Sequence, residues 1–315
     1  MPGQPRKHHF VPSFYLAGFT DSGGKDGKLF VLDQQRLATW PGTPLTVGYE
    51  KDFHKIEPGP DGDELAFEKK LADMEGKWSL ALQAIIRCRH LNEDDSFGYL
   101  MQFVAFMAVR VPRVRKLISN FIDAGTKAGM RAKLASSEGL AHVREWLRES
   151  GNELSDDDFQ KFVSAVKTEE YVVDFDKTWH VTEILRLALP LSLLLSQRQW
   201  TLWFVAEDAP DLFSSDSPVS MTPLVETPGV PLGFRTPNTL LSVPLNRRIA
   251  LVSMIEMQLP PRTLDRLAVA QLNSATGRFS NQIYSPAPDF VWVMKTGQLG
   301  NASDLLAALG PHSSA

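Results

Sequence analysis

Four side chains in this sequence have the types that acid–base or phosphate chemistry requires, namely His8, His9, Arg110 and Asp216. Histidine transfers protons near neutral pH and is also a common metal ligand. The planar guanidinium of Arg110 lies in the apolar stretch AVRVPR and suits a phosphate or another anion. Asp216, in SSDSPV, could orient a histidine or hold a divalent metal. We therefore expect a polar cleft in which one histidine is the general base and Arg110 binds the anion.

Each of these residues also has a structural explanation. Successive residues of a strand point to opposite faces, so only one of His8 and His9 can face a given site from a regular strand. A buried Arg110 needs a partner because its charge cannot be lost, and either Glu75 or Asp216 could form that ion pair. Asp216 could instead bond to nearby backbone in a turn. If these explanations hold, the same residues form a structural polar network.

The histidine pair continues into a patterned segment, HHFVPSFYL. Pro12 fixes the backbone there, and Phe10, Phe14 and Tyr15 offer aromatic area to the core, so the segment anchors the N-terminus. The hydroxyl of Tyr15 is also a candidate for substrate binding. The sequence has no HExxH, CxxC, Walker A or GxSxG pattern, so no familiar metal, nucleotide or serine-hydrolase motif names the reaction.

The composition limits the function classes. The chain has 315 residues and a formal net charge of −4, so a nucleic-acid or nucleotide partner would need a local basic patch. The single cysteine, Cys88, excludes an internal disulfide framework and fits a reducing cytoplasm. We see no secretion signal. The most apolar run, LRLALPLSLLL, is too short to span a bilayer, so we expect a cytoplasmic protein without a membrane partner.

Alternating hydrophobicity predicts strands at both ends of the chain, with helices between them. Residues 8–57 are expected to be extended. The helices include residues 94–122, with a bend near Pro112, and residues 177–198. The charged stretch at 127–168 is expected to be an exposed helical excursion, and a turn between two strands is expected near Asn246–Arg247. This order predicts an α+β fold in which one mainly antiparallel or mixed sheet takes strands from both ends. We expect a single domain over residues 1–310 and a frayed tail at 311–315.

Several motifs in order resemble the bacterial domain-of-unknown-function family 4238. They are KHHFVPSFYLAGF, VGYEKDFHKIE, RVPRVR, LFSSDSPV, LLSVPLNRRIALV and QLNSATGRFSNQIYS. The opening motif is specific, the others add weight through their order, and together they cover nearly the whole chain. The family often has tyrosine where this chain has His54, which argues against a shared catalytic role for His54.

The resemblance implies a bacterial, intracellular, single-domain protein, and it implies no established activity. The family pattern falls on His8, His9, Pro12, Tyr15, Arg110, Pro112, Asp216, Pro218, Pro244 and Asn273. Through it, Asn273 joins Arg110 and Tyr15 as a candidate substrate-binding residue.

Two hypotheses of different class follow. In the first, the protein is a hydrolase-like or nuclease-like enzyme on a phosphate-containing substrate, with His8 or His9, Arg110 and Asp216 as its catalytic residues. A divalent metal is the cofactor that this residue set suggests. In the second, the protein is a non-catalytic binding or interaction protein, for instance in stress or phage defence. An open cleft would favour the first and a sealed, fully bonded network the second.

Overall fold

The computed structural model describes residues 7–51, 66–91, 95–169, 171, 173, 177–225 and 232–310. His54 and the tail at 311–315 lie outside the described residues. Its helices are α1 (Ser13–Leu16), the 3₁₀ helix η1 (Ala17–Phe19), α2 (Ala66–Cys88), α3 (Asp95–Val109), α4 (Pro112–Lys133), α5 (Ser137–Glu149), α6 (Asp156–Thr168), α7 (Lys177–Ser196), α8 (Arg266–Gly277) and α9 (Ala302–Leu309).

The fold is α+β, as predicted, and strands from the two ends of the chain share a sheet. This sheet has the order β3 (Ala38–Gly42), β2 (Leu29–Asp33), β11 (Gln282–Ser285), β6 (Ser214–Ser215). Strand β11 pairs antiparallel with β2, with Tyr284 opposite Val31, and also with β6. The first and last thirds of the chain therefore meet through backbone hydrogen bonds.

The prediction of one sheet was wrong, because the described strands form four. A five-stranded sheet has the order β10 (Arg262–Leu264), β5 (Gln199–Val205), β9 (Ile249–Met254), β8 (Thr239–Asn246), β7 (Ser220–Pro223). Two-stranded sheets pair β1 (Lys7–His9) with β4 (Tyr49–Lys51), and β12 (Trp292–Val293) with β13 (Leu299–Gly300). Alternating hydrophobicity identifies strands, but it does not specify which strands pair.

Two further differences have local causes. The segment expected to be extended turns into α1 and η1 directly after Pro12, which precedes the first helical residue. Residues 94–122, which read as one helix with a bend, form α3 and α4 instead. Pro112 begins α4, where its missing N–H leaves no hydrogen bond unmade.

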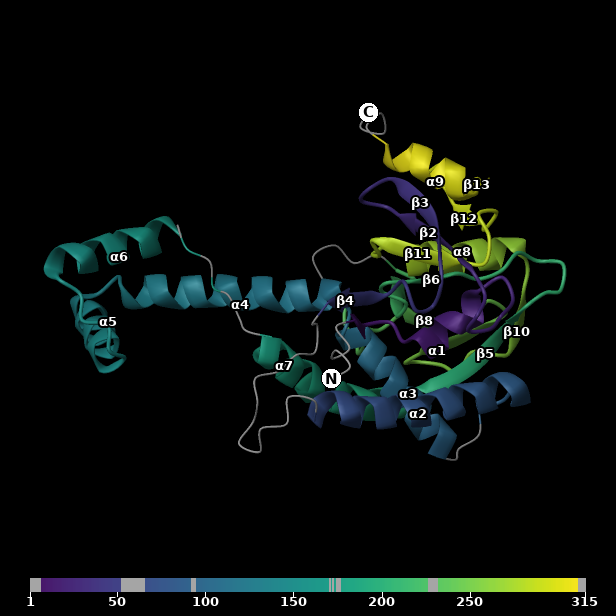
Figure 1. Ribbon diagram of the computed structural model, residues 1–315, viewed down its shortest axis with the longest axis horizontal. Coiled ribbons are helices and arrows are strands. Elements are labelled where there is room, and N and C mark those ends of the chain that lie inside the picture. Colours follow the sequence, from purple (N-terminus) through teal and green to yellow (C-terminus); the bar gives the residue numbers. More distant parts are fainter. Residues whose placement is uncertain are drawn as a thin grey trace, which may run out of the picture.

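The main core lies where α2, α3 and α7 pack together beneath the sheets (Figure 1). Helix α3 is apolar on nearly every face, and eight of its residues are buried. The ring of Trp78 on α2 lies 4.8 Å from Phe106 and 6.1 Å from Phe103, measured between ring centroids. A helix that is hydrophobic all round belongs inside, so α3 is the central element of the body.

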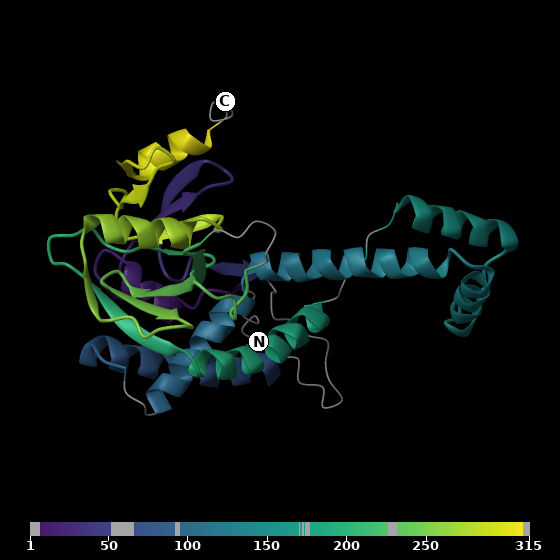
Figure 2. The same ribbon diagram turned by 180° about the vertical axis from the view of Figure 1, so that it is seen from behind.

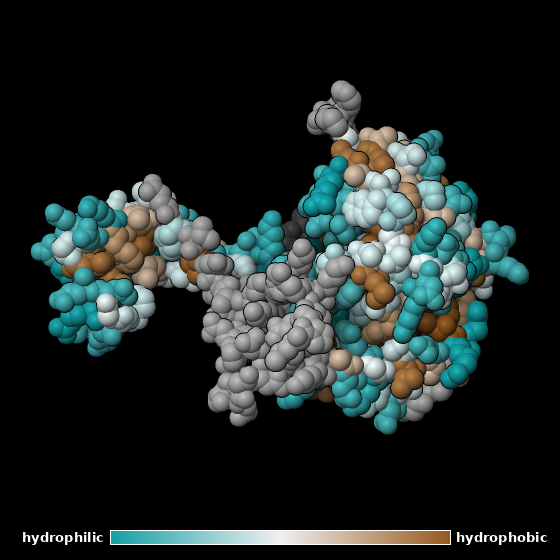
Figure 3. Space-filling view, viewed as in Figure 1, coloured by the Kyte–Doolittle hydropathy of each residue, from teal (hydrophilic) through white to brown (hydrophobic). Residues whose placement is uncertain are grey.

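Helices α4, α5 and α6 form an arm that extends away from this body (Figures 1 and 2). None of the residues of α4 is buried. The far end of the arm has its own small apolar cluster, visible between α5 and α6 in Figure 3, which consists of Leu134, Val143, Leu147, Phe159, Val163 and Val166. Residues 127–168 lie in this arm. Within the described residues, no helix is both long and apolar enough to cross a membrane.

Candidate functional site

The histidine pair lies in strand β1, which pairs antiparallel with β4. His8 lies opposite Glu50 and is buried, whereas His9 lies opposite Tyr49 and is half-buried. The rings of His9 and Tyr49 are 5.8 Å apart between centroids. The two histidines thus differ in burial as alternation along a strand requires, and they do not converge on one site.

Arg110 lies between α3 and α4 and is only 1% exposed. Its Nε donates to the carbonyl oxygen of Phe10 at 2.8 Å, and its Nη2 donates to Oε1 of Glu75 at 3.0 Å. The Nη1 atom is buried, without an acceptor among the described residues. Of the two partners that the sequence suggests, Glu75 is therefore the one observed. Arg110 ties the N-terminal segment to α2, and it does not lie open to an anion as predicted.

Tyr15 is fully enclosed. Its hydroxyl donates to the carbonyl oxygen of Pro244 at 2.7 Å and accepts from Oγ of Ser214 at 3.1 Å. Burial raises the pKa of Tyr15 above its ordinary value, and the Ser214 hydrogen bond offsets only part of this. The hydroxyl therefore joins segments more than 190 residues apart in sequence, and it is sealed from the solvent where a substrate would bind.

Asn273 on α8 is equally enclosed, and its side-chain amide bonds to three backbone groups in two segments. Its Oδ1 accepts from the Phe213 N–H at 3.0 Å, and its Nδ2 donates to the carbonyls of Asp211 and Val291 at 3.2 and 3.0 Å. An amide with both ends bonded in a buried site has no polar group left for a ligand. The geometry thus gives Asn273, like Tyr15, a structural role in place of the predicted substrate contact.

Asp216 has different surroundings. It directly follows β6, and the residue is 8% exposed. Its backbone N–H donates to Gln282, and its Oδ1 accepts from the Asn281 N–H at 3.0 Å. The backbones of Gln282 and of Asp216 itself also hydrogen-bond to this carboxyl group. Burial raises the pKa of Asp216 to about 6, because desolvation outweighs the backbone donors, and the nearby charge of Asp33 raises it further.

Arg113 lies within electrostatic range of this carboxyl group, and Arg278 shares an aromatic ring with Arg113. The guanidinium of Arg113, at the start of α4, lies 4.1 Å from the ring centroid of Phe279, and that of Arg278 lies 5.3 Å from the same centroid. Partial burial lowers the pKa of Arg113, whereas the charge of Asp216 opposes that change. Phe279 is two residues from Asn281, whose amide holds Asp216. We call Asp216, Arg113, Arg278 and Phe279 the Asp216 rim.

A buried hydrogen-bond chain connects the rim to β4. The Tyr284 hydroxyl accepts from the Gly48 N–H and donates to Oε1 of Gln282 at 2.9 Å. The Nε2 atom of Gln282 donates to Oδ2 of Asp33 at 3.2 Å. Burial raises the pKa of Tyr284 well above its ordinary value, and the charges of Asp216 and Asp33 add to the effect. The segment that contains Gly48, which follows the histidine motif in sequence, therefore meets the Asp216 motif at one end of the four-stranded sheet.

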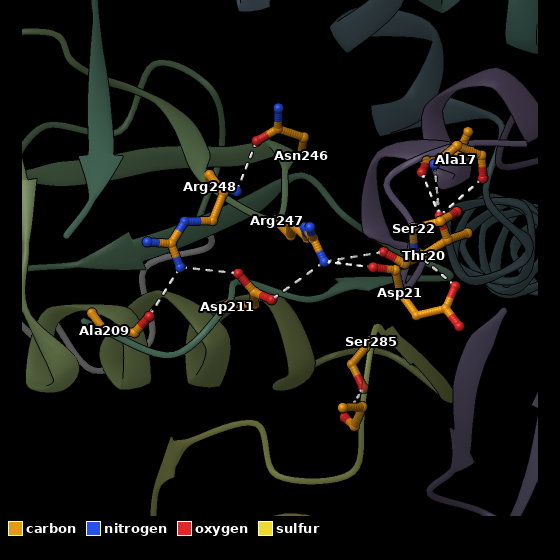
Figure 4. Close-up of polar contacts among 12 residues, drawn as sticks. Ala17, Thr20, Asp21, Ser22, Ala209, Asp211, Asn246, Arg247, Arg248 and Ser285 are labelled. Atoms are coloured by element: carbon orange, nitrogen blue, oxygen red, sulfur yellow. Dashed lines mark hydrogen bonds and ion pairs between the residues drawn. The ribbon is translucent and has the colours of Figure 1, made fainter. Parts of the chain in front are cut away.

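A second polar cluster lies at the β8–β9 turn (Figure 4). Arg248 donates through Nη1 to Oδ1 of Asp211 at 3.1 Å, and its backbone N–H donates to Oδ1 of Asn246 at 2.8 Å. The Nη1 atom of Arg247 donates to the Asp21 carbonyl at 2.9 Å and lies 3.9 Å from Oδ2 of Asp211. A cavity of about 330 Å³ lies beside these side chains. The cluster mainly fastens the turn to the N-terminal segment.

These motifs are shared with one family. A family model described as a protein of unknown function, DUF4238, matches residues 7–285. The chain belongs to the DUF4238 family. No curated protein and no solved structure matches it. The matched span of this DUF4238 protein includes both histidines, Arg110, Asp216 and Asn273, and the family description gives no activity.

The sequence-predicted residues of this DUF4238 protein thus separate into two groups. His8, Tyr15, Arg110 and Asn273 are buried, and Asp216, which is buried as well, is set apart by a carboxyl pKa that burial raises to about 6. Among the described residues, no group of three or more His, Cys, Asp or Glu side chains could hold a metal ion. Arg113, Arg278 and Phe279 were not singled out from the sequence, although RVPRVR and QLNSATGRFSNQIYS, which contain them, are among the family motifs.

Proposed function

We propose that this DUF4238 protein is a hydrolase-like enzyme that acts on a phosphate-bearing substrate at the Asp216 rim. The observation that carries the proposal is an enclosed carboxyl group within electrostatic range of Arg113, which shares the ring of Phe279 with a second arginine, Arg278. In this proposal Asp216 transfers the proton, and Arg113 and Arg278 bind the phosphate. The base role moves from the histidine pair to Asp216.

The pKa of about 6 supports this assignment. At pH 7 such a carboxyl group is mostly ionised, yet it is far more basic than an ordinary aspartate, which is what a general base requires. Asp216 would accept a proton from a water molecule as the water oxygen bonds to phosphorus. The ester P–O bond then breaks, and the proton passes to the departing oxygen. The arginines would neutralise the phosphate charge through paired N–H donors.

Hydrolysis of p-nitrophenyl phosphate and bis(p-nitrophenyl) phosphate by the purified full chain tests the proposal. Asp216→Asn should lower kcat by roughly 10²- to 10⁴-fold, the usual contribution of a general base. In the wild type, kcat/KM should fall as pH decreases through about 6, because the base becomes protonated. The double variant of Arg113→Gln with Arg278→Gln should raise KM.

Asp208→Asn is the matched control, because Asp208 is an exposed aspartate in the loop after β5. It should leave the rate unchanged. Wild-type rates in Asp216→Asn would overturn the proposed role of Asp216, and failure of the wild type to hydrolyse both probes would count against phosphate chemistry.

One observation favours the second candidate, a non-catalytic interaction protein. Large apolar side chains are exposed on the arm, with Phe121 78% exposed, Leu117 64% and Trp146 52%. Leu117 and Phe121 are four residues apart on α4 and so lie on one face of that helix, and an exposed apolar patch of this kind is typical of partner surfaces. In this case Phe121→Ser would remove binding of the partner, whereas Asp216→Asn would not. If the wild type hydrolyses phosphoesters and Asp216→Asn abolishes this activity, the result favours the enzyme over the interaction protein.

A further inference from the structure

A cavity of about 640 Å³ lies on the body, where the ends of α2 and α7 meet the start of α3 and strand β5. It is formed by Arg89, His90, Leu91, Phe97, Ser196, Arg198, Gln199, Trp200, Thr201, Leu202, Phe204, Gln258 and Pro261. None of the residues that form the Asp216 rim is among them. Its volume is in the range of pockets that enclose small organic ligands.

The charges along this cavity have one sign. Arg89 and His90 are exposed and Arg198 is half-buried, and the described lining contains no Asp or Glu. The guanidinium of Arg198 is fixed in place, because its Nε donates to Oγ of Ser253 at 3.1 Å and its Nη1 donates to the Phe234 carbonyl at 2.8 Å. Burial lowers the pKa of Arg198, whereas Glu256, which does not line the cavity, lies close enough for its charge to raise it, so the positive charge that an anionic ligand would meet is mainly that of Arg89.

Arg89 is held beside the cavity in an unusual way. Its guanidinium lies 4.1 Å from the centroid of the Phe204 ring, and no described residue accepts a hydrogen bond from it. Its backbone has φ of 55°, a left-handed conformation that is uncommon for residues other than glycine. Arg89 follows the last residue of α2, and its backbone N–H donates to the Ile85 carbonyl at 2.8 Å, so this conformation is the left-handed end of that helix. The stacked arginine thus presents unused N–H donors beside an aromatic wall.

We propose that this cavity binds an anionic compound with a planar ring, of the size of a nucleoside monophosphate. Arg89 binds the anionic group, and the aromatic residues Phe97, Trp200 and Phe204 form the apolar wall against which the ring packs. Aromatic rings and arginine guanidinium planes stack on nucleobases of any type, so the site recognises the class and not one base. The site is separate from the Asp216 rim, and its ligand is independent of the proposed reaction.

Isothermal titration calorimetry of the full chain with adenosine and uridine 5′-monophosphates tests this inference. Adenosine carries the planar ring without the anionic group, and inorganic phosphate carries the anionic group without the ring. Each, titrated separately, should bind at least about tenfold more weakly than adenosine monophosphate. Arg89→Asn should weaken nucleotide binding by about tenfold or more, and asparagine tolerates the left-handed backbone. Phe204→Leu should weaken it as well.

Arg262 offers a matched control. Its guanidinium lies 5.7 Å from the centroid of Trp203, the residue next to Phe204 on β5, and neither side chain lines the cavity. Arg262→Gln should leave the affinity unchanged. The inference is overturned if neither nucleotide binds more tightly than about 1 mM, if phosphate alone binds equally well, or if Arg262→Gln weakens binding as much as Arg89→Asn.

The double variant of Arg113→Gln with Arg278→Gln separates this inference from the proposed function, because it removes the two arginines that would bind a phosphate at the Asp216 rim. It should leave nucleotide binding to the cavity unchanged. If it removes nucleotide binding, the ligand is at the Asp216 rim and the inference fails.

Discussion

Ser214 and Asp216 lie two residues apart, at and just after β6, and they belong to regions with opposite character. Ser214 belongs with Tyr15 and Asn273 to a sealed network, which we define by these three residues, and their side-chain polar groups bond within the protein. Asp216 accepts backbone hydrogen bonds, yet burial still raises its pKa to about 6. The sealed network holds distant segments together, whereas the Asp216 rim retains a buried carboxyl group whose ionised form is disfavoured by its surroundings.

This difference has consequences of opposite sign for stability. A buried polar group whose partners are all present stabilises the folded state, and removal of it leaves those partners unsatisfied. The pKa of Asp216 in the folded state, about 6, is above its unfolded value of 3.8. The folded state therefore binds the proton more tightly, and stability is lost as pH rises from the unfolded pKa through the folded pKa. An ionised Asp216 destabilises the fold at neutral pH, which is typical of functional groups.

The largest expected effect is at Asn273. Asn273→Ala removes three hydrogen bonds and leaves two carbonyls and one N–H unsatisfied in a buried site. At about 1–3 kcal/mol for each unsatisfied group, reduced by partial relaxation, we expect a loss of roughly 3–5 kcal/mol in the free energy of unfolding. Urea denaturation at pH 7 measures it. The exposed Asn152→Ala should change the free energy of unfolding by no more than about 0.5 kcal/mol. A loss below about 1 kcal/mol at Asn273 would show that the network is not sealed.

The second effect has the opposite sign. Asp216→Asn should increase the free energy of unfolding at pH 8 by up to about 3 kcal/mol, because asparagine cannot ionise and its Oδ1 can still accept from the Asn281 N–H. The gain should disappear near pH 4, where Asp216 is protonated in the folded state. Thermal and urea unfolding of both proteins between pH 4 and pH 8 measure the difference, and Asp208→Asn should show no such trend. A loss of stability at pH 8 would place Asp216 with the sealed network.

Much of the fold could be predicted because its signals are local. The hydrophobic period identified the α3 and α7 helices, and the extended segments on either side of Asn246–Arg247 identified the β8–β9 turn. The division of the strands among four sheets could not be read in this way, because pairing depends on contacts between distant segments. The break between helices α3 and α4 at Arg110 could not be distinguished from a bend for a related reason. A proline is compatible both with a bend inside one helix and with the first residue of a second.

The candidate site was predictable to a smaller extent. Strand alternation correctly separated His8 from His9, and the need of a buried arginine for a partner correctly suggested Glu75. Residue type alone did not distinguish a sealed hydroxyl from an open one, because the partner of Tyr15, the Pro244 carbonyl, is 229 residues away. The same limit concealed Arg113, which approaches Phe279 only in the folded chain.

The smallest expected effect tests the sealed network at one atom. Tyr15→Phe removes the hydroxyl that donates to the Pro244 carbonyl and accepts from Ser214, and it leaves the ring packed against Phe19 and Phe103. We expect a loss of about 1–2 kcal/mol in the free energy of unfolding, measured by urea denaturation.

Ser214→Ala supplies the matched comparison, because it removes the other end of one of these hydrogen bonds. If the two hydroxyls act as one network, the double variant loses less stability than the sum of the single variants, since the shared bond can be lost only once. Neither variant should change phosphoester hydrolysis at pH 7. If Tyr15→Phe lowers kcat while the free energy of unfolding stays constant, Tyr15 acts in the reaction. Tyr15 would then belong to the reactive region and not to the sealed network, so the reactive region would extend further into the core than the hydrogen bonds indicate.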